Sequence, residues 1–103
     1  MAKYLLLYAG GSMPVTDEQR DVVMKAWDGW FHTLGKGLVD GGNPFSQSKK
    51  VSADGSITAG AGDASGYSII EADSLDAATD LAKGCPVLQG GASVSVFETF
   101  EAM

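Results

Sequence analysis

The stretch GYSIIEADSLDAATDLAKGCPVLQGGASVSVF, residues 66–97, decides the fold, because it contains one complete strand–helix–strand unit. Residues 66–71 are a strand-like apolar run, and Ser74 stands where a helix N-cap is expected. The helix that follows has apolar residues at helical spacing: Leu75, Ala78, Leu81 and Ala82. Residues 84–86, Gly-Cys-Pro, end this helix, and residues 93–97 begin a final strand.

The first third of the chain repeats this pattern. Residues 3–8 predict a strand that is apolar on both pleat faces, which is typical of a central strand. Thr16 and Gln19 fit a capping box at the start of a long helix. The apolar stripe predicted for this helix is Val23, Trp27, Trp30 and Leu34. The opposite face is polar, with Asp21, Lys25, Asp28 and His32, and Gly35 or Gly37 is expected to end the helix.

The middle of the chain predicts a short strand and a hairpin. The second strand starts at residues 38–40, and Pro44 indicates an edge position or a bulge, because proline cannot donate to a ladder. A three-residue loop at 53–55 places Val51 and Ile57 on one face. Its third position needs a left-handed residue, and Gly55 stands there. We expect this hairpin to project as a mobile arm, and we expect residues 60–66 to be a loop.

The order β-α-β-hairpin-β-α-β predicts one α+β domain, residues 1–103, with a ferredoxin-like βαββαβ fold and an inserted hairpin. In this fold the first and third strands are central, and both helices cover one face. The other face then presents apolar side chains to water. An apolar face of that size is usually an interface, so we expect a homodimer closed sheet to sheet, a dimeric α+β barrel.

Composition excludes several classes of partner. Seven Lys and Arg stand against thirteen Asp and Glu, a net charge of −6, which repels a phosphate backbone and argues against nucleic acid. No stretch approaches the ~20 apolar residues of a membrane span. A single cysteine, Cys85, forbids an intrachain disulfide and fits a reducing, cytoplasmic compartment. We expect no cofactor and no metal, because the glycines have no phosphate-loop spacing and no Cys/His cluster exists.

The chain resembles the YCII-related (DGPF-type) domain family. The resemblance rests on residues 3–8, on residues 66–78, and on Gly-Cys-Pro at 84–86 followed by residues 94–96. It implies a dimeric α+β barrel. It also implies a catalytic pair, a His on the first helix and an Asp near the second strand, for which His32 and Asp40 are the candidates. The Asp-Gly-Pro-Phe tetrad is absent, and Asp40 precedes the glycine turn at 41–44 instead of following it.

The residues themselves allow a structural interpretation beside each functional one. His32 lies opposite the aromatic stripe, which favours a surface position beside the negative helix end. Asp40 fits a turn-capping carboxylate as well as an acid or base. As lining of a ligand pocket we select Trp27, Asn43, Tyr67 and Glu71. The competing interpretations are a core position for Trp27 and strand-end exposure for Glu71.

Two functions follow from these patterns. The first is a dimeric module that binds or responds to a small apolar metabolite. The alternative is a small isomerase or lyase-like enzyme that uses a carboxylate, Asp40, and His32 in acid–base chemistry. A buried, pKa-shifted carboxylate beside an open cavity favours the enzyme, and a closed cleft with every candidate residue exposed favours the binding module.

Overall fold

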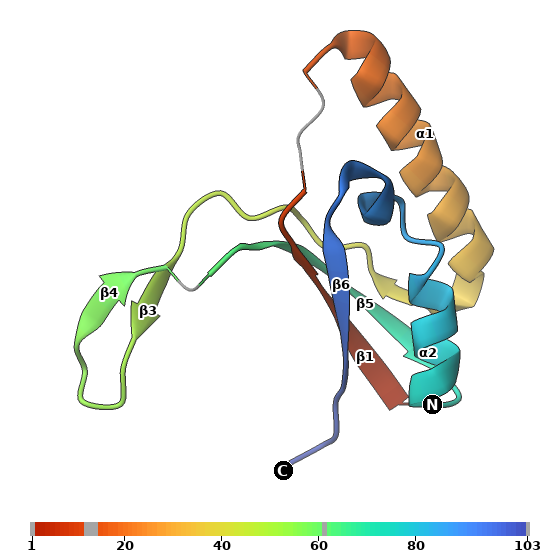
Figure 1. The fold of residues 1–103 in the computed structure, drawn as a ribbon. Helices are drawn as coiled ribbons and strands as arrows, with labels where there is room; N and C mark the ends of the chain where they lie inside the picture. Colours follow the sequence, from red (N-terminus) through yellow and green to blue (C-terminus); the bar gives the residue numbers. More distant parts are fainter. Residues whose placement is uncertain (1, 12–14, 61, 103) are drawn as a thin grey trace.

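The computed structural model describes residues 2–11, 15–60 and 62–102. A four-stranded antiparallel sheet carries two helices, and a separate two-stranded hairpin projects from it (Figure 1). The strands are β1 (Ala2–Ala9), β2 (Leu38–Asp40), β3 (Lys49–Val51), β4 (Ile57–Ala59), β5 (Ala64–Ala72) and β6 (Ser93–Glu98). The helices are α1 (Asp17–Leu34) and α2 (Leu75–Ala82), with short 3₁₀ turns η1 (Gly35–Gly37) and η2 (Pro86–Gly90). The predicted order of elements and the α+β class are confirmed.

The sheet has the order β2-β5-β1-β6, so the first strand and the long third strand of the sheet are central, as predicted. Strand β1 pairs with β5 on one side and with β6 on the other, so Leu6 faces both Ser68 and Val96. Strand β2 is an edge with a bulge between Leu38 and Asp40. Beyond the bulge, Pro44 forms an isolated bridge with Gly66. The edge position, one of the two alternatives that Pro44 indicated, is therefore confirmed, and the bulge lies upstream of Pro44.

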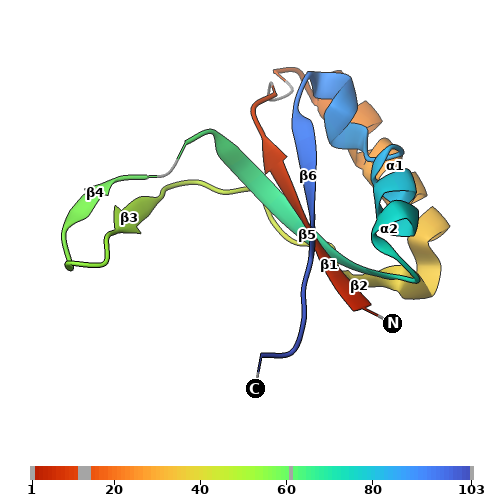
Figure 2. The same ribbon diagram turned by 60° about the horizontal axis from the view of Figure 1, so that its bottom comes forward.

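Both helices cover the same face of the sheet (Figure 2). The core between the layers contains Tyr4, Leu6, Tyr8, Trp30, Leu34, Ile70, Ala72, Ala78, Ala82 and Cys85. Alternation along β1 and β5 sends every second side chain into this core. Each helix starts where the sequence indicated. Thr16 accepts from the backbone of Gln19 at 3.1 Å, and Ser74 accepts from Ala77 at 3.0 Å.

Helix α1 is less buried than its apolar stripe predicted. Trp30 and Leu34 are buried, and Trp27 is half-buried, but Val23 is 37% exposed. The reason is position, because the N-terminal half of α1 extends past the ends of the strands (Figure 1). Gly35 caps the other end with a φ of 53°, so the predicted glycine stop is confirmed.

The hairpin has the predicted register. Val51 pairs with Ile57, Ser52 donates to the carbonyl of Ser56 at 2.8 Å, and Gly55 has a φ of +89°. The loop predicted over residues 60–66 was partly wrong. Strand β5 already begins at Ala64, because Pro44 and Phe45 pair with its first residues, and residue 61 lies outside the described residues.

Candidate ligand site on the open face of the sheet

The face of the sheet away from the helices, which we call the open face, is apolar at its centre. Strand register places Leu5 between Ile69 and Phe97, and Leu7 beside Tyr67. The four of these residues on β1 and β5 are half-buried, namely Leu5, Leu7, Tyr67 and Ile69, and Phe97 on β6 is 49% exposed. The predicted exposure of apolar side chains on this face is therefore confirmed. Water meets this surface in the isolated chain.

A polar and aromatic cluster stands at the β2 rim of the open face. The Tyr67 hydroxyl donates to Asp40 Oδ2 at 3.3 Å. The ring of Phe45 stacks on that of Tyr67, with centroids 6.0 Å apart and planes 21° apart. Asp40 Oδ1 accepts from the backbone of Gly42 at 2.8 Å. The carboxylate thus has one oxygen fixed by its own turn and the other directed at a phenol. We call Asp40, Phe45 and Tyr67 the rim cluster.

Local backbone geometry brings the rim cluster together. Gly42 has a φ of +73°, and a Cβ there would collide with the carbonyl of Tyr67. Only glycine allows the chain to pass this close to β5. The chain then continues beside β5, where Phe45 donates its backbone N–H to Ser65 at 2.9 Å. The sequence allowed Asp40 to be a turn-capping carboxylate, and the structure contains that turn. The same turn directs the other carboxylate oxygen toward Tyr67.

The remaining pocket candidates lie in different places. Asn43 is exposed on the β2 rim, next to the bridge that Pro44 forms. Glu71 is half-buried on β5 and stands opposite Lys3, toward the far end of the sheet. Trp27 is half-buried in an aromatic cluster on the helix side, with ring centroids 5.7 Å from Tyr8, 5.7 Å from Trp30 and 5.5 Å from Phe31. The structure therefore brings together Asp40 and Tyr67, and it places Trp27 on the other face.

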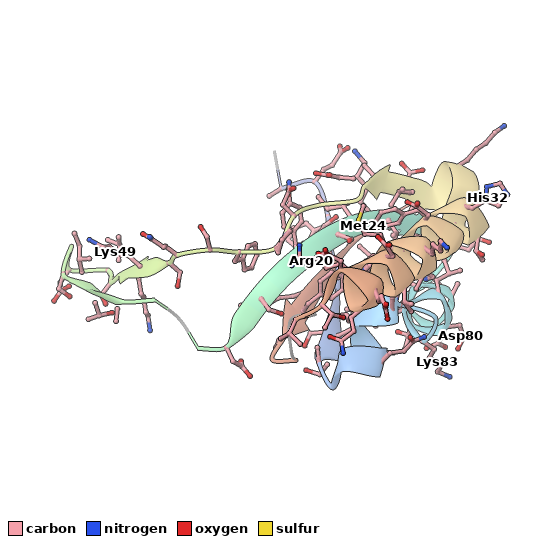
Figure 3. All side chains as sticks on the ribbon, turned by 90° about the horizontal axis from the view of Figure 1, so that it is seen from above. Arg20, Met24, His32, Lys49, Asp80 and Lys83 are labelled. Atoms are coloured by element: carbon pink, nitrogen blue, oxygen red, sulfur yellow. The ribbon has the colours of Figure 1, made fainter. Side chains whose placement is uncertain are left out.

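His32 is exposed near the end of α1, on the polar face predicted for it (Figure 3). His32 and Asp40 are both described residues, and no hydrogen bond or ion pair joins them. His32 and Asp40, the catalytic pair suggested by the family resemblance, are therefore not in contact with each other within one chain. The predicted exposure of His32 is confirmed.

Sequence reasoning missed a buried polar chain between the sheet and the helices. The Tyr8 hydroxyl donates to Ser68 Oγ at 2.7 Å, and Ser68 donates to the carbonyl of Gly41 at 2.7 Å. Burial raises the pKa of Tyr8, and burial likewise raises the pKa of the neighbouring Cys85 thiol. A lone serine at an inward position of a central strand was the available signal. This hydrogen-bonded chain ties the turn after β2 to the core, and none of its three residues lines either of the two grooves described next.

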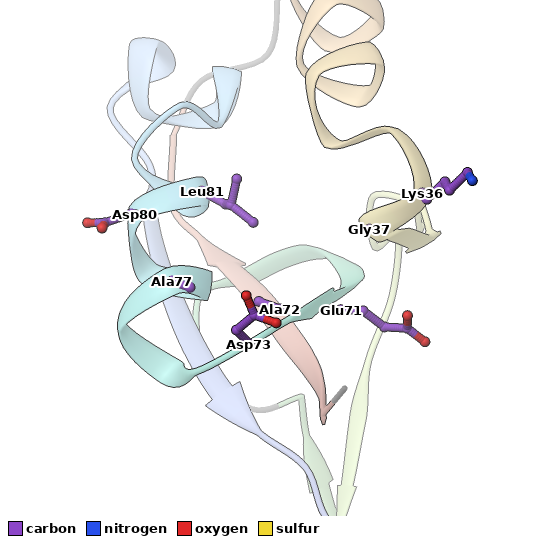
Figure 4. A pocket seen from close by; sticks show the side chains of 8 residues that line it. All are labelled: Lys36, Gly37, Glu71, Ala72, Asp73, Ala77, Asp80 and Leu81. Atoms are coloured by element: carbon purple, nitrogen blue, oxygen red, sulfur yellow. The ribbon is translucent and has the colours of Figure 1, made fainter.

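Two open grooves lie elsewhere on the described surface. The larger, about 580 Å³, runs between α2 and η1 at the end of β5 (Figure 4). Leu81 points into it, whereas Lys36, Glu71 and Asp80 point away. Near the same end of the sheet, the Tyr4 hydroxyl donates to Glu98 at 2.9 Å. Burial and then the Glu98 carboxylate raise the pKa of Tyr4. The smaller groove is lined by Ala2, Lys3 and residues 99–101.

Two general findings apply to residues 2–11, 15–60 and 62–102. Within these ranges, no three His, Cys, Asp or Glu side chains gather closely enough to hold a metal ion. Within the same ranges, no helix has the length and apolar character needed to cross a membrane.

Comparison with known proteins supports the fold. No protein-family model and no curated protein matches the chain. Among solved structures, the chain is similar to the 5-chloro-2-hydroxyhydroquinone dehydrochlorinase from Burkholderia phenoliruptrix, solved in complex with 2,5-dihydroxybenzoquinone. The TM-score is 0.54 at 18% identity, over 95% of this chain and 93% of that one. At this identity the likeness shows the shared α+β fold.

Proposed function

We propose that residues 1–103 form one YCII-related domain that works as a homodimeric α+β barrel and binds a small, largely apolar metabolite with a planar ring. The ligand lies against the rim cluster, at the margin of the interface between the two packed sheets. The observation that carries the proposal is the open face itself, which is apolar at its centre and has a phenol–carboxylate pair with a stacked ring at one rim.

The size of the exposed surface supports a dimer. The chain has 7360 Å² of accessible surface at 10.6 kDa. A folded monomer of that mass is expected to expose about 5,500 Å². The radius of gyration, 15.1 Å, is likewise larger than the ~13 Å expected for a compact chain of this length. A standard interface removes ~800 Å² from each partner, so the excess is large enough for a stable dimer.

The rim cluster favours a hydroxylated ring as ligand. Phe45 and Tyr67 offer stacked aromatic faces, and stacking of a third ring adds about 0.5–1.5 kcal/mol beyond area burial. Asp40 accepts hydrogen bonds, and the Tyr67 hydroxyl both donates and accepts. The similar dehydrochlorinase was solved with 2,5-dihydroxybenzoquinone, a planar hydroxylated ring. Because the enolic hydroxyls of that compound are acidic and leave it an anion at neutral pH, we choose hydroquinone, a neutral planar ring with two hydroxyls, as the first probe.

Titration calorimetry with hydroquinone at neutral pH tests the proposal. We expect Tyr67→Phe and Asp40→Asn each to weaken binding about tenfold, because each substitution removes one hydrogen bond to the ligand or weakens it by removing a charge. Asparagine retains an acceptor for the backbone of Gly42, so the turn persists while the charge is removed. His32→Ala is the matched control and leaves the affinity unchanged. Equal affinities for wild type, Tyr67→Phe and Asp40→Asn contradict the proposed site, and a monomer at micromolar concentration in sedimentation contradicts the dimer.

The Asp40–Tyr67 contact also favours a second candidate, an isomerase or lyase-like enzyme. A carboxylate with one oxygen fixed by its turn and the other at a phenol is placed to accept a proton from a bound ring hydroxyl or carbon acid. Under this alternative, Asp40→Asn abolishes turnover while retaining ligand binding. A binding module shows no turnover in either protein, so the comparison separates the two functions.

A further inference from the structure

The β3–β4 hairpin, residues 49–59, which we call the arm, presents an apolar pair to water. Val51 and Ile57 pair across the two strands and share one face. They are 67% and 64% exposed. A two-stranded sheet alone is marginally stable in water, and it persists when a further surface covers its apolar face. The arm therefore has the composition of an element that packs against something else.

The direction of the arm indicates where that surface lies. In three views, the arm extends from the sheet on the side opposite α1 and α2 (Figures 1, 2 and 3). This is the side of the open face, against which the homodimer proposed above places its partner. From Gly55 to the start of β5 the extended chain spans up to about 30 Å. Packed sheets lie about 10 Å apart, so the arm is long enough to pass the sheet of a partner.

The charge of the arm is opposite to that of the whole chain. Lys49 and Lys50 stand on β3 with a single carboxylate, Asp54, at the turn, whereas the chain carries −6. Both lysines are exposed. Within the described ranges, the ion pairs are Arg20–Asp17 and Lys83–Asp80, so neither arm lysine is engaged. A basic element on an acidic protein is complementary to another copy of the same protein.

We propose that the arm clasps a second copy of this chain, an inference that rests on the homodimer proposed above and adds a separate contact to it. The Val51–Ile57 pair packs on the flank of the partner, and Lys49, on the same face of the arm, lies near its carboxylates. By two-fold symmetry each copy gives one arm and receives one. The interface then consists of the open faces at its centre and the two arms at its sides.

Hydrogen exchange on the full chain tests the clasp directly. Exchange is measured for a peptide spanning residues 49–59 and for one from β1, above and below the concentration at which sedimentation shows dimerisation. We expect the arm amides to slow at least tenfold on dimerisation. An arm that exchanges equally fast in monomer and dimer overturns the clasp, and so does an arm that is already protected in the monomer.

A pair of variants separates the arm from the sheet face. The double substitution Val51→Ser with Ile57→Ser is expected to raise the dimer dissociation constant at least tenfold. For wild type, 0.5 M salt also raises this constant, because the Debye length falls to about 4 Å and the contact of Lys49 with the partner's carboxylates is screened. Thr58→Ser, on the other face of the arm, is the control and leaves the constant unchanged. An unchanged constant in the double variant overturns the clasp alone. A wild type that stays monomeric overturns both the dimer and the clasp.

Discussion

The two faces of the sheet differ more in their surroundings than in their side chains. On strand β1, Tyr4, Leu6 and Tyr8 point under the helices and are at most 5% exposed. Leu5 and Leu7, on the same strand, point the other way and are only half-buried. The helices, and not the strand sequence, make one face a core. The comparison teaches that the apolar residues of the open face contribute little to folding of one chain and need another reason to be apolar.

The largest expected effect is on the free energy of unfolding, when neighbouring leucines on the two faces of β1 are each replaced by alanine. Leu6→Ala removes a fully buried side chain between Ser68 and Val96, and it is expected to lower the free energy of unfolding by about 2–5 kcal/mol. Leu5→Ala, one residue away, is expected to cost about 1 kcal/mol in the monomer, because its side chain is already half in water. Urea unfolding at low protein concentration measures both.

Protein concentration sharpens the same comparison. If the open face closes on a partner, the cost of Leu5→Ala grows as the concentration of protein rises, and that of Leu6→Ala stays constant. A Leu5→Ala cost that is independent of concentration contradicts a role of the open face in dimerisation.

A smaller effect is expected from serine truncation on the two faces. Ser68→Ala leaves the hydroxyl of Tyr8 and the carbonyl of Gly41 without their partner, and it is expected to cost about 1–3 kcal/mol. Ser95→Ala lies on β6 toward the open face, where the serine is exposed, and is expected to change stability by no more than about 0.5 kcal/mol. Thermal unfolding of both variants checks this difference. Equal costs contradict a structural role for the buried chain.

The covered face was the more predictable one from the sequence. Alternation along residues 3–8, the Thr16 and Ser74 caps and the glycine stop each depend on neighbours in the chain, and all were confirmed. The hairpin register was predictable for the same reason, because the position of Gly55 permits only one arrangement with Val51 and Ile57 on one face.

The candidate site was less predictable, because it depends on contacts between distant residues. Asp40 and Tyr67 were both selected from the sequence, but their contact joins residues 27 positions apart. It arises from the bulge in β2 and from Gly42 passing against β5. Phe45 gave no periodic signal, since it stands alone after Pro44. The exposure of the start of α1 was missed for a different reason. Its apolar stripe is regular, but the stripe alone does not reveal where the strands of the sheet end.

The smallest effect concerns ionisation on the covered face. Burial raises the pKa of Tyr8, so the folded chain holds the phenol proton more tightly than the unfolded chain does. The stability from this neutral phenol is complete below the unfolded value of about 10, and it is lost as the pH rises beyond that value toward the folded pKa. Wild type should therefore lose stability with rising pH more steeply than Tyr8→Phe does. Leu5→Ala, on the open face, keeps the wild-type slope. Urea unfolding at several alkaline pH values measures the three slopes, and phenolate absorbance follows the titration. Identical slopes for wild type and Tyr8→Phe contradict a phenol that folding keeps neutral.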